Sequence, residues 1–179
     1  MRLAVISIAL GMALAAGSSA WADEPTYYQC SLDLKDMPAG APRFEDYSVP
    51  VGKIARPAPV KLRTDFDRGF RTRLRLAGKG PPNFAGHYAV SLWGCGTGCA
   101  TYAGVDLASG EVVIVGGSVG ETPMDRVQSR PDSRLLIVTG KDSEDSPDIE
   151  AVRYFLWTGK ALKLLKAYPY KDVCRPDAN

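Results

Sequence analysis

The sequence predicts an α+β fold that is mainly β, with an antiparallel sheet or meander, one amphipathic helix and stabilising disulfides. The first observation is a succession of short runs rich in Val, Ile, Tyr, Leu and Trp beyond Pro82, separated by turn residues. The second is one preceding segment with apolar residues at helical spacing. The third is an even number of cysteines, four in the chain, which is typical of a disulfide framework in an exported protein.

The amphipathic helix is predicted over Asp65–Ala77. Thr64 is of a residue type that caps helix N-termini, and Gly78 ends the run. Gly69 is an interior weakness because glycine is a poor helix former. The apolar residues at helical spacing are Phe66, Phe70, Leu74 and Ala77.

The remaining elements are an early edge strand and a series of strands after the helix. Residues 27–34 around Cys30 predict the edge strand, and the Pro- and Gly-containing residues 36–42 predict a loop. Residues 108–110 and 158–160 are predicted hairpin tips. The later strands are predicted over Gly86–Trp93, Ala100–Leu107, Glu111–Val115, Arg134–Thr139, Val152–Trp157 and Ala161–Ala167.

The first residues predict export. Arg2 is followed by the apolar run Leu3–Leu14, and Ala20–Ala22 forms a small-x-small cleavage site. We expect residues 1–22 to be a signal peptide and residues 23–179 to be a single β-rich domain in the periplasm or outside the cell. The apolar run is shorter than the roughly 20 residues that span a bilayer, so no transmembrane segment is expected.

The charge pattern argues against nucleic acid and for a local basic surface. A formal net charge of +2 at pH 7 is too small to imply a nucleic-acid partner. On the predicted helix, basic residues fall on the face opposite Phe70 and Leu74. They are Arg68, Arg71, Arg75 and Lys79. This ridge is either a solvated face paired with the acidic loop 142–150 or a docking surface for anionic lipid, glycan or an acidic protein.

The cysteines predict disulfides and no metal or cofactor site. Proximity favours Cys95 with Cys99, and Cys30 with Cys174 then joins the two ends of the domain, although three pairings are possible. The Cys-x-x-x-Cys spacing differs from the redox Cys-x-x-Cys. A metal site would need His87 and a further ligand such as Asp106, and nothing else converges on them.

The segment NFAGHY at 83–88, followed by WGCGTGC at 93–99, resembles a group of uncharacterised exported bacterial proteins that carry this signature after a basic helix. The resemblance covers roughly residues 70–107 and, to a lesser extent, the final hairpin. It implies an envelope location and a β-rich fold. It implies no mechanism, because the group has no established activity.

Two motifs carry candidate chemistry. His87, the only histidine, is either a hydrogen-bonded structural residue or the base for Cys95 as a nucleophile, and the nucleophile fails if Cys95 is oxidised. Residues 116–120 match the G-x-S-x-G motif of hydrolases around Ser118. No histidine lies downstream of that serine, so we interpret the glycines as a turn.

The glycine-rich segment 94–99 is either a disulfide-pinned turn or a ligand cradle. Together with the ridge it gives the candidate binding residues His87, Gly94, Gly96, Thr97, Gly98, Arg68, Arg71 and Arg75. The favoured function is a non-enzymatic periplasmic binding protein of the cell envelope, an inhibitor of a cell-wall hydrolase being one form of it. The alternative is a small envelope hydrolase or thiol enzyme that uses His87 with Cys95 or Ser118.

Overall fold

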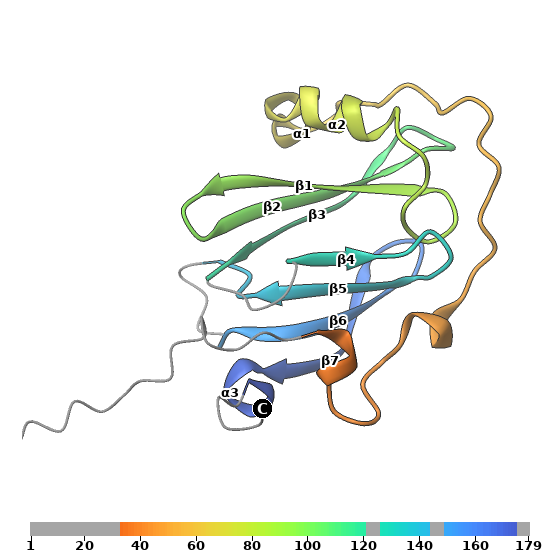
Figure 1. Cartoon of the computed structure of the whole chain (residues 1–179). Coiled ribbons are helices and arrows are strands. Elements are labelled where there is room, and N and C mark those ends of the chain that lie inside the picture. The colour runs from red at the N-terminus through yellow and green to blue at the C-terminus, as the bar shows by residue number, and fades with distance from the viewer. Residues whose placement is uncertain (1–32, 121–125, 144–148, 175–179) are drawn as a thin grey trace, which may run out of the picture.

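The described part of the chain forms two antiparallel sheets, which confirms the mainly β fold (Figure 1). The structure is a computed structural model, and it describes residues 33–120, 126–143 and 149–174. The first sheet contains β1 (Tyr88–Gly96), β2 (Cys99–Asp106) and β3 (Val112–Val119). The second contains β4 (Val127–Ser129), β5 (Leu135–Gly140), β6 (Ala151–Trp157) and β7 (Leu162–Pro169). Each sheet is a meander, because strands adjacent in the sequence pair with one another.

The described helices are short and lie outside the sheets. They are the 3-10 helices η2 (Leu34–Asp36) and η3 (Phe44–Tyr47) and the α-helices α1 (Asp65–Gly69), α2 (Arg71–Ala77) and α3 (Tyr170–Val173). Within the described ranges, no helix has the length and apolar character to cross a bilayer. The predicted signal peptide and Cys30 lie outside the described residues.

The prediction of one continuous helix is wrong, because two helices meet at Phe70. Its backbone angles, φ −104° and ψ 20°, are not helical. The break comes directly after Gly69, the interior weakness that the sequence indicated, and Phe66 and Phe70 still contact the same partner, with ring centroids 6.4 and 5.1 Å from that of Trp93. The predicted cap is confirmed: Thr64 Oγ1 accepts a hydrogen bond from the amide of Asp67, whose carboxylate accepts one from the amide of Thr64.

Three apolar clusters hold the layers together. Helices α1 and α2 cover the outer face of the first sheet, and the second sheet lies on its other side (Figure 1). The cluster between the sheets includes Phe84, Tyr88, Tyr102, Ile114, Leu136, Val138 and Trp157. The outer face of the second sheet packs against residues 34–47 and α3. Strand β5 is buried on both faces because its alternate side chains enter different clusters.

Several boundaries differ from the prediction. Residues 116–119 belong to β3, so the interpretation of Gly116 and Gly117 as part of a turn is wrong. Glycine is needed at position 116 because the ring of Tyr102 lies where a Cβ would be. The predicted edge strand 27–34 falls mostly outside the described residues, and Leu34 begins η2. Strand β4 and helix α3 were not predicted. Each is only three or four residues long, too short for a periodic pattern.

Candidate functional site

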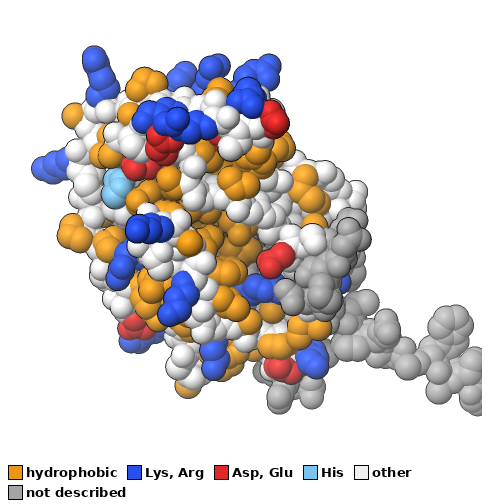
Figure 2. Space-filling model, turned by 180° about the vertical axis from the view of Figure 1, so that it is seen from behind, with side chains coloured by type: hydrophobic (Ala, Val, Ile, Leu, Met, Phe, Trp, Pro, Cys, Tyr) orange, Lys and Arg blue, Asp and Glu red, His pale blue; other side chains and the backbone are white. Residues whose placement is uncertain are grey.

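A group of exposed basic side chains lies on α2 and just after it. We call this group, Arg71, Arg73, Arg75 and Lys79, the basic face. None of the four forms an ion pair with another described residue. Figure 2 shows Lys and Arg side chains gathered at the end of the molecule where α1 and α2 lie. The basic face therefore presents charge that the rest of the described chain does not neutralise.

Arg68, a predicted ridge residue, differs from the others. Its guanidinium pairs with Asp65 Oδ1 at 2.6 Å and donates to the carbonyl of Arg63 at 2.8 Å. Arg73, which the ridge prediction omitted, is exposed and without such a partner in the described chain. The ridge prediction omitted it because in α2, as in the predicted helix, Arg73 lies on a different side from Arg71 and Arg75.

The described ends of the acidic loop 142–150, one of the two expected partners of the ridge, lie away from the helices. The carbonyl oxygen of Asp142 is 3.4 Å from the position of a Cβ on Gly117 in β3, and the carboxylate of Glu150 approaches Gly120. Both described ends of the acidic loop therefore lie near the end of β3, whereas α2 packs on the outer face of the first sheet. Residues 144–148 are outside the described ranges.

An exposed apolar side chain accompanies the basic face. Leu76 is 65% exposed, although Leu74 two residues earlier is completely buried. In an α-helix these two positions point in different directions, so α2 directs one leucine into the core and the other into solvent. The surface around α2 is thus basic with an apolar projection.

An ion-pair cluster anchors the segment before the helices to the first sheet. Glu111 accepts hydrogen bonds from Arg63 at 2.7 and 2.8 Å and from Lys61 at 2.9 Å. The hydrogen bonds from Arg63 and then Lys61 lower the pKa of Glu111 to about 2. In addition, the amide of Lys61 donates to the carbonyl of Gly110. These contacts position the chain that leads into α1.

The glycine-rich loop lines a small cavity. Cys95 and Cys99 form the predicted disulfide, with their Cα atoms 5.2 Å apart. Gly96 and Thr97 face a cavity of about 630 Å³ whose other walls include β3 and Asp142. Gly94 and Gly98 are not among its lining residues. Cys174 is also disulfide-bonded, while its predicted partner Cys30 lies outside the described residues.

His87 lies at the far end of β1 from this loop. Its Nε2 is 3.7 Å from Asp106 Oδ1, and its ring centroid is 4.2 Å from that of Tyr88. Eight residues of nearly extended chain separate it from Cys95, about 26 Å at roughly 3.3 Å per residue. The structure therefore does not bring His87 and Cys95 together, and the disulfide leaves no thiolate at Cys95.

Ser118 is equally removed from His87. It is completely buried in β3, opposite Ala100, and its hydroxyl donates to the carbonyl of Thr139. A nucleophile elbow would expose this hydroxyl on a sharp turn between a strand and a helix. In the described ranges, no three His, Cys, Asp or Glu side chains come together as a metal site.

A second cavity, which the sequence did not indicate, lies on the outer face of the second sheet. It has a volume of about 980 Å³ and is bounded by residues 34–47, Arg130, Ile137 and Tyr154. The loop prediction for residues 36–42 was the only sequence signal near it. Comparisons with family models, with curated proteins and with solved structures found no match.

Proposed function

We propose that the protein is an exported, non-enzymatic binding protein of the cell envelope that docks on anionic lipid through the basic face. The observation that carries this proposal is the set of four exposed cations on and after α2 that have no ion-pair partner in the described chain. The export expected from residues 1–22 would place this surface in the periplasm or outside the cell.

Leu76 favours a lipid surface over a glycan. An exposed leucine among arginines suits the boundary between headgroups and acyl chains, where cations meet phosphates and apolar groups enter the membrane. A polysaccharide offers no comparable apolar environment. Anchoring of the helices to the first sheet through Leu74 and Trp93 would hold this surface rigid.

The enzyme alternative has no support in the geometry. It requires His87 beside Cys95 or Ser118, and both lie at the opposite end of the first sheet from His87. The cavity beside the glycine-rich loop contains Asp142 but no histidine among its lining residues. A binding role places no such demand on these residues.

Vesicle sedimentation tests the proposal. The protein should co-sediment with vesicles of phosphatidylglycerol and phosphatidylcholine, and binding should weaken as salt shortens the screening length. Each cation near an anionic surface contributes about 1 kcal/mol, so changing Arg71, Arg73 and Arg75 together to Gln should lower the partition coefficient on the order of 100-fold. Leu76→Ser should lower it further.

A charge-matched control shows whether vesicle binding depends on the basic face or only on the net charge of the protein. Changing Lys163, Lys166 and Lys171 together to Gln also removes three exposed cations, but from β7 and α3. This variant should retain most of its vesicle binding. Equal losses in the two triple variants, or equal binding to vesicles of pure phosphatidylcholine, would contradict docking through the basic face. Retention on anionic glycan without vesicle binding would replace lipid by glycan.

A further inference from the structure

The larger cavity is built by the segment that precedes the helices. Residues 34–47 cross the outer face of the second sheet, and Phe44 enters the apolar cluster there. The far end of the segment is fixed by hydrogen bonds, including that from Ser133 Oγ to the carbonyl of Phe44 at 2.8 Å. Residues 37–43 form an arch whose backbone hydrogen bonds to described residues are all local, from Met37 to Leu34, from Ala41 to Pro38 and from Asp46 to Arg43. The arch leaves a cavity of about 980 Å³ over β5 and β6.

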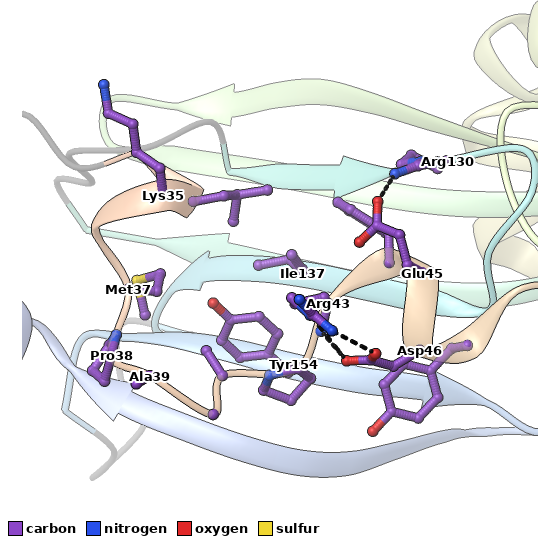
Figure 3. Close-up of a pocket in the computed structure, with 16 residues that line it drawn as sticks. Lys35, Met37, Pro38, Ala39, Arg43, Glu45, Asp46, Arg130, Ile137 and Tyr154 are labelled. Atoms are coloured by element: carbon purple, nitrogen blue, oxygen red, sulfur yellow. Dashed lines mark hydrogen bonds and ion pairs between the residues drawn. The ribbon is translucent and has the colours of Figure 1, made fainter.

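Each charged residue that lines this cavity has an ion-pair partner, including Lys35, whose Nζ lies 3.8 Å from Asp33 Oδ2. Arg43 pairs with Asp46 at 3.2 Å, and Arg130 pairs with Asp132 at 2.8 Å and with Glu45. Figure 3 shows the Arg43–Asp46 and Arg130–Glu45 pairs beside the cavity. Its other lining residues are mostly apolar: Leu34, Met37, Ala41, Phe44 and Ile137. The cavity thus favours a neutral, largely apolar ligand over an ion.

Tyr154 contributes a polar group to this cavity. The residue is 1% exposed, and no other described residue accepts a hydrogen bond from its hydroxyl. The hydroxyl points toward the side of the cavity where Met37 lies (Figure 3). Burial raises the pKa of Tyr154 to about 12, so the phenol remains protonated and is a hydrogen-bond donor at neutral pH. The Tyr154 hydroxyl is not one of the fully buried unpartnered polar atoms of the described chain, so it reaches the cavity, where a bound molecule could accept its hydrogen bond in place of water.

We infer that this cavity binds a neutral, largely apolar molecule whose carbonyl oxygen accepts a hydrogen bond from Tyr154. The apolar body would lie against Met37 and Ile137, beneath the arch of residues 37–43. This binding does not depend on the proposed docking of the basic face, because the cavity and α2 belong to different sheets.

The fluorescent ketone Prodan is a suitable probe, since it combines a neutral naphthalene ring with one carbonyl group. Its emission should shift to shorter wavelength on saturable binding to the purified protein. Tyr154→Phe removes only the hydroxyl and should weaken binding roughly 2- to 10-fold, as the loss of one hydrogen bond predicts. Ala41→Phe should fill the cavity and abolish saturable binding. Tyr168→Phe is the matched control, because Tyr168 packs against Tyr154 but does not line the cavity.

Thermal unfolding distinguishes a ligand-binding hydroxyl from a structural one. Removing a hydroxyl that has no hydrogen-bond partner among the described residues should leave the Tm of Tyr154→Phe unchanged or raise it. Absence of saturable Prodan binding to the wild-type protein would overturn the inference. So would wild-type affinity in Tyr154→Phe, or a Tm lowered by several degrees in that variant. If Ala41→Phe does not fold, the comparison of Tyr154→Phe with Tyr168→Phe decides alone.

Discussion

The substitution Gly116→Ala tests whether β3 continues through the glycines at positions 116 and 117, which belong to the G-x-S-x-G match. A Cβ at this position would lie 2.8 Å from Cε2 of Tyr102 and closer still to Cζ and Oη. Tyr102 is 6% exposed and belongs to the cluster between the sheets, so its ring has little room to move. Gly116→Ala therefore overpacks the core, and we expect a loss of about 1–3 kcal/mol in the free energy of unfolding.

Two other glycines provide matched controls for this substitution. At Gly117 the nearest atoms to a Cβ are carbonyl oxygens at 3.4 and 3.6 Å, so Gly117→Ala should change stability little. Gly69 ends α1, and no atom of the described residues lies within 4 Å of the position of its Cβ, so Gly69→Ala should stabilise by about 0.5–1 kcal/mol because alanine is the better helix former. Urea unfolding followed by tryptophan fluorescence measures all three variants.

A double-mutant cycle identifies the cause of the loss. In a Tyr102→Ala background the ring is absent, so the added methyl group of Gly116→Ala should cost much less than in the wild-type protein. An equal cost in both backgrounds would show that the ring is not responsible. If Gly116→Ala were as stable as Gly117→Ala, the close approach of the Tyr102 ring to Gly116 would be refuted.

Two further predictions concern the loop and the ion-pair cluster. Changing Cys95 and Cys99 together to Ala should lower the free energy of unfolding by about 2 kcal/mol, which is the chain-entropy value for so short a loop. Urea unfolding measures this loss. An unchanged free energy of unfolding would show that the disulfide shapes only the loop. The pKa of Glu111 is lowered from its ordinary 4.5 to about 2, so its stabilising effect is present above pH 4.5 and is lost as the pH falls toward 2. In acid titrations followed by circular dichroism, Glu111→Gln should be less stable than wild type above pH 4.5, and the two proteins should converge near pH 2. A difference that persists near pH 2 would contradict this assignment.

The strands were predictable because their signal is local. Runs of β-branched and aromatic residues between turn residues located β1, β2, β5, β6 and β7 to within a few residues. The Thr64 cap and the Cys95–Cys99 pair were also predictable, since each depends on residues three or four positions apart. What these features share is that no distant part of the chain decides them.

The errors arose where a distant residue decides the local structure. The glycines at 116 and 117 give the same sequence signal whether they form a turn or admit the ring of Tyr102, and only the pairing of β2 with β3 distinguishes the two. The break at Phe70 is an exception, because it directly follows Gly69, the interior weakness that the sequence does show. His87 and Cys95 are close in sequence, but a strand of extended chain separates them in space. The larger cavity could not be predicted, because its lining residues are spread between positions 34 and 154 and no short motif connects them.

The two proposed binding places lie on opposite sides of the stacked sheets. The basic face belongs to the helices that cover the outer surface of the first sheet, whereas the arch of residues 37–43 lies over the outer surface of the second (Figure 1). A molecule docked on lipid through α2 would therefore hold its cavity away from the membrane surface and open to the surrounding solution. Because the sheets share the buried cluster around Trp157 and Leu136, the cavity and the basic face would keep a fixed relation to each other. Such an arrangement suits a protein that stays at a membrane surface while it takes up a small molecule from the adjoining aqueous phase.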